Sequence, residues 1–97
     1  MSTRVNGAEP PVILVTAKAT LVAGSAYLVL TVREESENLW CYNLSGPGRN
    51  NRAAFGKFIV TGYMTALRRA AEICGDGYPP GTIERGLLDA FARDTLR

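Results

Sequence analysis

The sequence contains no histidine, and this absence excludes a large part of enzyme chemistry. Histidine is the commonest general base near neutral pH and the commonest metal ligand, and without it no Ser-His or Cys-His nucleophile can form. Glu72, Asp76 and Glu84 flank a loop, but at no spacing typical of a carboxylate active site. We therefore expect a protein that is not an enzyme and that holds neither a metal ion nor another cofactor.

Cysteines are few, and long hydrophobic runs are missing. Cys41 and Cys74 match no metal-binding or redox spacing, so we expect free, buried thiols in a reducing cytoplasm. No apolar stretch approaches the roughly 20 residues that a membrane span needs. The first residues also lack the charged and hydrophobic regions of a signal peptide. The sequence thus predicts a cytoplasmic protein that does not enter a membrane.

A strong excess of one charge is absent as well. The chain has 11 basic and 9 acidic residues, and a net charge of +2 does not by itself indicate a nucleic-acid partner. Its 97 residues, 46% of them hydrophobic, are typical of one globular domain. Residues 1–10 are polar and lead into a Pro-Pro pair, so we expect a flexible arm at 1–10 and a single domain at 11–97.

Alternating and β-branched residues in the first half predict a three-stranded antiparallel meander. The expected strands cover 12–22, 26–34 and 39–44, and a Gly-Ser turn and an acidic turn at 34–38 connect them. We interpret the acidic turn as a solvated hairpin tip. The alternation assigns one set of side chains to the covered face of the sheet, namely Val15, Ala17, Ala19, Leu21, Leu28, Leu30 and Val32.

The opposite face of this sheet is a candidate binding surface. It would carry Lys18, Tyr27, Thr31 and Arg33, and a mixture of aromatic and basic side chains on a sheet is typical of single-stranded nucleic-acid platforms. A half-exposed sheet normally carries such a mixture too. Trp40 and Tyr42 share a face with Leu44, so we expect those two aromatic residues in the core.

The segment Asn51–Cys74 has the apolar periodicity of one long helix. Phe55, Phe58, Ile59 and Gly62 share one stripe, which we expect to pack across the sheet. Two glycines inside this helix, Gly56 and Gly62, would each cost about 1 kcal/mol relative to alanine. We expect them where a neighbouring backbone comes close.

A second helix is predicted over Ile83 to about Thr95. The preceding stretch 75–81 is rich in glycine and proline and must be a loop, and Thr82 is a plausible N-cap. The expected apolar row of this helix is Ile83, Leu87, Ala90 and Phe91. The architecture expected for the whole chain is therefore βββαα, in the α+β class.

The loop 45–52 is the most suggestive candidate site. Its glycines and the start of the expected helix could hold a phosphate or a carboxylate, although a solvated loop capped by Asn50 or Asn51 would have the same sequence. Further basic residues would follow on the helix and could track a phosphate backbone. The proposed anion or nucleic-acid contacts are Arg49, Asn50, Arg52, Lys57, Arg68 and Arg69.

The same loop resembles a known signature. Asn50-Asn51-Arg52, after three strands, is similar to the T-N-N-R-x-E motif of ribonuclease H. The resemblance covers three identical residues. Ala54 stands where that family has a catalytic glutamate, and the first strand has no aspartate, so the carboxylates that hold the family's metal ions are missing. We do not assign the chain to the family.

A second apolar row on the long helix has two interpretations. Val60, Met64 and Leu67 continue toward Ala71, and the C-terminal helix could cover them as part of the core. Alternatively they form a protein-docking face for a partner or a second copy, with arginines at its rim.

These observations favour a non-catalytic protein-binding module. A small, single-domain chain of this kind is similar in style to stoichiometric inhibitors of bacterial macromolecular complexes that phages and mobile elements encode, such as anti-CRISPR proteins. The expected partner is another protein or a ribonucleoprotein complex. The alternative is a small nucleic-acid-binding protein that uses the arginine-bearing loop and helix face, and a homodimer is a further option.

Overall fold

The computed structural model describes residues 14–46 and 54–95. They form a four-stranded antiparallel sheet followed by two helices, which confirms the α+β class and corrects the number of strands from three to four. The arm predicted at 1–10 lies outside the described residues, as does most of the 45–52 loop. The elements are β2 (Thr16–Ala23), β3 (Ala26–Ser36), β4 (Leu39–Ser45), β5 (Ala54–Ile59), α1 (Tyr63–Gly75) and α2 (Ile83–Thr95).

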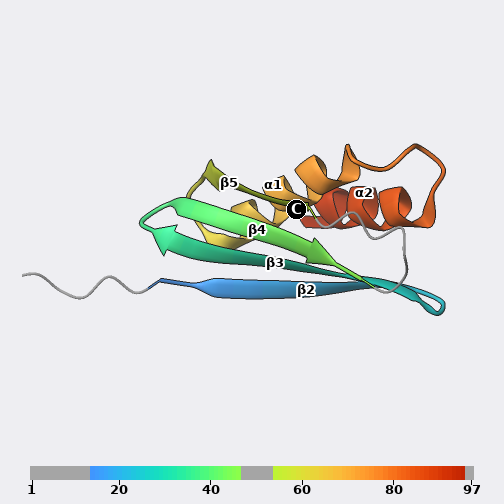
Figure 1. Ribbon diagram of the computed structural model, residues 1–97, viewed down its shortest axis with the longest axis horizontal. Coiled ribbons are helices and arrows are strands. Elements are labelled where there is room, and N and C mark those ends of the chain that lie inside the picture. Colours follow the sequence, from blue (N-terminus) through green and yellow to red (C-terminus); the bar gives the residue numbers. More distant parts are fainter. Residues whose placement is uncertain (1–13, 47–53, 96–97) are drawn as a thin grey trace, which may run out of the picture.

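The sheet is a simple meander in which each strand pairs with the next one along the chain, in the order β2-β3-β4-β5 (Figure 1). The register opposes Leu21 to Leu28 and Leu30 to Leu44, so their side chains lie on one face. All four are buried. The covered face predicted from the alternation is confirmed, because Val15, Ala17 and Ala19 also pack against this core.

The acidic turn is shorter than predicted. β3 continues to Ser36, and the turn itself is Glu37-Asn38. The Glu34 carboxylate accepts hydrogen bonds from the backbone N–H of Asn38 at 2.9 Å and of Val15 at 3.4 Å. Interpreting Glu34 as part of a solvated tip was therefore wrong, since it joins the start of β2 to the β3–β4 turn.

The long helix predicted over Asn51–Cys74 is wrong in its first half, because 54–59 form β5 and α1 begins at Tyr63. The change of structure occurs at Gly62, whose φ of 89° lies in the left-handed region that favours glycine. A run of β-branched residues, Ile59, Val60 and Thr61, precedes it and lowers helix propensity.

Gly56 has a different role from the predicted one. It lies opposite Tyr42 in the β4–β5 pairing, and a Cβ atom at Gly56 would stand 2.8 Å from the Tyr42 Oη. The Tyr42 ring also stacks on Phe58, with ring centroids 5.7 Å apart. The close neighbour of Gly56 is therefore an aromatic ring of the adjacent strand, not a backbone.

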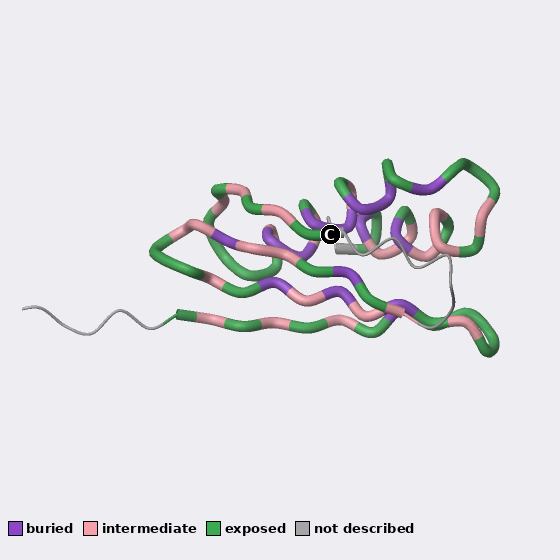
Figure 2. Tube along the Cα trace, viewed as in Figure 1, coloured by how far each residue is buried: buried purple, intermediate pink, exposed green. Residues whose placement is uncertain are grey.

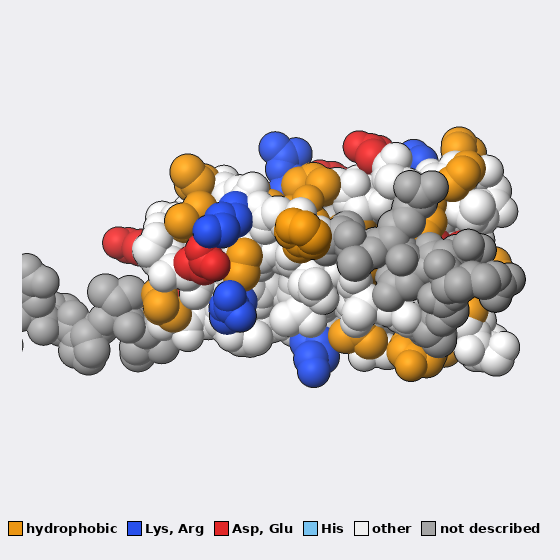
Figure 3. All heavy atoms as spheres, in the orientation of Figure 1, with side chains coloured by type: hydrophobic (Ala, Val, Ile, Leu, Met, Phe, Trp, Pro, Cys, Tyr) orange, Lys and Arg blue, Asp and Glu red, His pale blue; other side chains and the backbone are white. Residues whose placement is uncertain are grey.

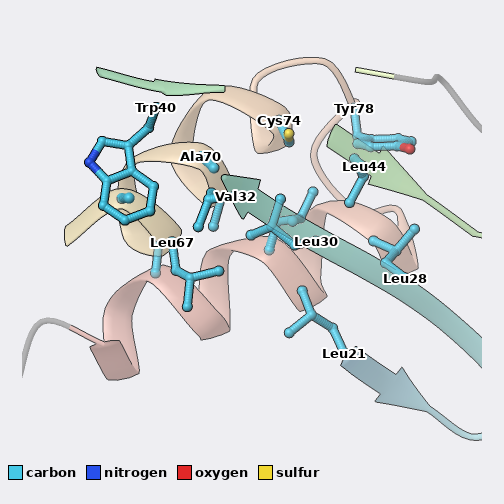
Figure 4. Packing of buried hydrophobic residues seen from close by; sticks show 14 residues of the cluster. Leu21, Leu28, Leu30, Val32, Trp40, Leu44, Leu67, Ala70, Cys74 and Tyr78 are labelled. Carbon is cyan, nitrogen blue, oxygen red and sulfur yellow. The ribbon is translucent and has the colours of Figure 1, made fainter. Parts of the chain in front are cut away.

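Both helices pack on the same face of the sheet and against each other. Burial is concentrated on β3 and on the helix surfaces that meet the sheet (Figure 2). The α1 residues at the contact are mostly small, which lets the helix approach the sheet and α2 closely. The core is shown in Figure 4 and consists of Leu21, Leu28, Leu30, Val32, Trp40, Leu44, Ala66, Leu67, Ala70, Ala71, Cys74, Tyr78, Leu88 and Ala92.

The predicted bounds of α2 are confirmed, and so is its cap. The backbone N–H of Arg85 donates to the Thr82 Oγ1 at 3.2 Å, and Arg85 pairs with Asp89 at 3.0 Å one turn later. The predicted apolar row needs a correction. Leu88 is fully buried, whereas Ile83 is 57% exposed.

Candidate functional site

The outer face of the sheet, turned away from both helices, is the candidate site. Among the described residues, no helix or strand covers this face. It carries apolar side chains that are unusually open to solvent, since Phe55 and Ile59 on β5 are each 77% exposed. Val22 on β2 and Tyr27 on β3 add to them. Figure 3 shows hydrophobic side chains beside basic and acidic ones on the face turned to the viewer.

A hollow of about 390 Å³ lies on this face over β3, β4 and β5. Its origin is the register of the side chains. On β4, Cys41 stands between Arg33 and Lys57, and Asn43 stands between Thr31 and Phe55. Cys41 is shorter than both Arg33 and Lys57, and Asn43 is shorter than Phe55, which leaves a depression over β4. Its lining residues are Thr31, Arg33, Glu35, Cys41, Tyr42, Asn43, Phe55, Gly56 and Lys57.

One carboxylate holds both cations of the hollow. Glu35 lies at an irregularity of the β3–β4 pairing, between Glu34 and Ser36. Its Oε1 is 2.8 Å from the Lys57 Nζ, and its Oε2 is 3.7 Å from the Arg33 Nη2. The hydrogen bond from Lys57 lowers the pKa of Glu35, and the same bond raises the pKa of Lys57.

These pKa directions keep both groups charged at neutral pH. A carboxylate that acts as a general base needs a raised pKa, and a nucleophilic lysine needs a lowered one. The Glu35–Lys57 pair has the opposite shifts. The arrangement is therefore better suited to recognising a charged or polar group than to transferring a proton.

The two cysteines differ in environment. Cys74 is buried in the core, as predicted, but Cys41 is half-buried in the hollow. The Cys41 Sγ–H donates to the backbone carbonyl of Arg33 at 3.4 Å. Both are free thiols. The expectation of buried thiols is thus correct for Cys74 and wrong for Cys41.

Burial raises the pKa of the Cys74 thiol from 9.0 to about 11. The unfolded chain then loses this proton at a lower pH than the folded protein, so stability falls as the pH rises from 9 toward 11. The expected loss is at most about 3 kcal/mol. We expect thermal melts of a Cys74→Ala variant to lack this part of the alkaline decline.

Burial and, to a smaller extent, the nearby Cys74 raise the pKa of Tyr42, so the difference between the two proteins contains the titration of Cys74 and its effect on Tyr42. An identical pH dependence of the melting temperature in the two proteins would contradict the burial of the thiol.

The basic residues proposed from the sequence do not form one stripe. Lys57 lies on β5, and its partner is Glu35. Arg68 and Arg69 lie on α1, where both pair with Glu72 at 3.1 and 3.7 Å. The helical phosphate track that combined Lys57 with the two arginines is therefore wrong. Arg49, Asn50 and Arg52 lie outside the described residues.

The predicted docking row is not one continuous surface. Val60 precedes α1 and is partly buried, Leu67 is buried in the core, and Met64 is 50% exposed. The interpretation of this row as core therefore holds for Leu67 and Ala71. A binding role for Met64 stays a prediction.

The sequence analysis placed some of the outer face correctly. Lys18, Tyr27, Thr31 and Arg33 lie on it, while Trp40 and Tyr42 face the core side. It missed the contribution of β5, namely Phe55, Lys57 and Ile59. The available signal was the pair of glycines in this segment, Gly56 and Gly62, which disfavours a continuous helix.

Within 14–46 and 54–95, no group of three or more histidine, cysteine, aspartate or glutamate side chains could hold a metal ion. Neither helix in these ranges is long and apolar enough to cross a membrane. Comparison of the chain with family models, with curated proteins and with solved structures gave no match.

Proposed function

We propose that this protein is a non-catalytic binding module that engages another protein through the outer face of its sheet. The observation that supports the proposal is the hollow, bordered by the 77%-exposed Phe55 and by the Glu35–Lys57 ion pair. Exposed apolar side chains around a depression with a polar rim are typical of protein-binding surfaces.

A protein partner is favoured over a nucleic acid by the chemistry of this face. A nucleic-acid platform needs unpaired cations for phosphates and aromatic rings for base stacking. Arg33 and Lys57 instead share the Glu35 carboxylate. The face carries two exposed aromatic rings, Phe55 and Tyr27, but its other exposed apolar residues are aliphatic. Val22 and Ile59 offer no stacking surface and suit contact with apolar side chains of a protein.

The net charge of the outer face also indicates which charges we expect on the partner. Three cations, Lys18, Arg33 and Lys57, stand against one carboxylate, Glu35, so these groups carry a net charge of +2 (three minus one). We expect the partner to insert an apolar side chain into the hollow and to place acidic groups around it. A binder of this kind acts by occupying its partner stoichiometrically. Inhibition of a larger complex, in the style of small phage-encoded inhibitors, is one form of this function and rests on chain size alone.

The test is a substitution that fills the hollow. Asn43 is exposed in the middle of β4, and Asn43→Arg would place a long, charged side chain over the depression without touching the core. Thr61→Arg makes the same change of charge at an exposed position between β5 and α1. Tagged wild-type protein and both variants would be recovered from the cells that make the protein, and the bound proteins would be compared by quantitative mass spectrometry.

We expect a protein that wild type and Thr61→Arg retain and that Asn43→Arg loses by about tenfold or more. Equal recovery by all three would overturn the proposal. In parallel, fluorescence anisotropy would measure binding to labelled duplex DNA, single-stranded DNA and RNA at low and physiological salt. Micromolar binding that weakens with salt, and that Asn43→Arg changes but Thr61→Arg does not, would assign the face to nucleic acid instead.

A further inference from the structure

The outer edge of β5 has backbone groups available for another strand. β5 pairs with β4 on one side, and no described residue pairs with it on the other. The Val60 N–H donates to the Asn38 carbonyl at 3.0 Å, in the same register as the β4–β5 ladder. Bonded and non-bonded pairs alternate in an antiparallel ladder. Phe55, Lys57 and Ile59 therefore direct their N–H and C=O groups away from β4.

The side chains of these three residues are arranged almost symmetrically. Phe55 and Ile59 lie two residues to either side of Lys57, and both are 77% exposed on the outer face. A second, antiparallel copy of β5 centred on Lys57 would place Phe55 of each copy opposite Ile59 of the other. Pairs of an aromatic and a β-branched residue across strands are among the stabilising ones.

The charge at the centre of this arrangement is already balanced. Two lysines directly opposite each other would repel, and an edge lysine normally protects a sheet against such pairing. Here each Lys57 keeps Glu35 at 2.8 Å, so two copies would bring together two cations and two carboxylates. β5 also contains no proline and no bulge, which are the other common protections of an edge.

We propose that two copies of this chain associate by antiparallel pairing of their β5 edges, with a two-fold axis at Lys57. The pairing would form about six backbone hydrogen bonds between the copies. It would join both sheets into one continuous sheet and double the outer face. Because the contact involves one short strand from each copy, it is smaller than a standard interface, and we expect a dissociation constant of about 10–100 µM.

The other edge of the sheet provides a matched control. The Glu34 N–H donates to the Val15 carbonyl at 2.8 Å, so the same alternation directs the backbone groups of Lys18 and Val22 away from β3. Val22 is 62% exposed on the outer face. The sequence around it lacks the symmetry found around Lys57.

Sedimentation of the full chain would be measured from about 5 to 500 µM, a range that spans the expected dissociation constant. We expect the wild type and Val22→Lys to shift from monomer to dimer, and Ile59→Lys to weaken the association by at least tenfold. A wild type that stays monomeric throughout would overturn the proposal. The outer edge of β5 would then be available for pairing with an extended segment of another protein. Dimerisation that Val22→Lys abolishes and Ile59→Lys does not would overturn it as well.

Disulfide trapping tests the two-fold axis separately. In a Cys41→Ser background, Lys57→Cys would bring two thiols together at a residue pair about 5.5 Å apart between Cα atoms, a separation that suits a disulfide. Phe55→Cys would face Ile59 of the other copy and should not form a bond to itself. Equal trapping of both variants, or of neither, would exclude this register. The proposal is independent of a partner at the hollow, since Asn43→Arg leaves the β5 edge unchanged and should still dimerise.

Discussion

Replacing Trp40 with alanine is expected to destabilise the protein by about 3–5 kcal/mol, a large part of the roughly 5–15 kcal/mol that stabilises an ordinary domain. Trp40 is the largest fully buried side chain of the described residues, with 2% of its surface exposed. Its Nε1–H donates to the Val60 carbonyl at 3.1 Å. The substitution would open a cavity in the core and leave that carbonyl without its side-chain donor. The measurement is urea unfolding followed by circular dichroism, because Trp40 is the only tryptophan.

Trp40→Phe separates the two contributions. It keeps an aromatic ring in the core but removes the N–H, so we expect a smaller loss of about 1–2 kcal/mol. Met64→Ala, at a position that is 50% exposed, is the control for a large side chain outside the core and should change stability by about 0.5 kcal/mol or less. Equal effects of Trp40→Ala and Met64→Ala would be incompatible with the packing described.

The contact between Trp40 and Val60 is one reason why residues 54–59 form β5 although the sequence predicted a helix there. Residues 55–59 have helical spacing of apolar side chains and no strict alternation of apolar and polar ones. In the strand that they form, Phe58 points into the core while Phe55 and Ile59 remain exposed. Short apolar runs do not distinguish these alternatives. The interactions that favour the strand are long-range ones. They are the β4–β5 hydrogen bonds and the hydrogen bond from the Trp40 indole to the Val60 carbonyl, just after β5.

The glycine content of the segment was the signal available. Two glycines in one helix would together cost about 2 kcal/mol, a cost that the prediction attributed to close backbone contact. Gly62 in fact adopts a φ of 89° at the start of α1, and Gly56 makes room for Tyr42. By contrast, β2, β3 and β4 were predictable because β-branched residues, alternation and turn residues all favour the same structure.

The candidate site was less predictable than the fold. Glu35 and Lys57 are 22 positions apart in sequence, and their ion pair depends on the irregular register after Glu34 and on the presence of β5. The hollow arises from side-chain sizes on three neighbouring strands, so it appears only once the pairing is known. The charge pattern of the sequence instead predicted a site that includes Arg68 and Arg69. In the structure both arginines pair with Glu72 on their own helix.

The packing of α2 offers the second test of a large effect. We expect Leu88→Ala to cost about 2–5 kcal/mol, because Leu88 is fully buried and alanine would leave a cavity against the small residues of α1. Ile83, which the sequence pattern assigned to the same apolar row, is 57% exposed at the first turn of the helix. Ile83→Ala should therefore change the free energy of unfolding by less than about 1 kcal/mol.

The comparison of these two variants decides which face of α2 meets the sheet. Leu88 lies five residues after Ile83, which on a helix of 100° per residue places the two side chains about 140° apart. They cannot both point at the core. Urea unfolding of the two variants, followed by the fluorescence of the buried Trp40, measures both losses on one scale. A larger loss for Ile83→Ala would restore the row predicted from the sequence, and a larger loss for Leu88→Ala would support the helix orientation described here.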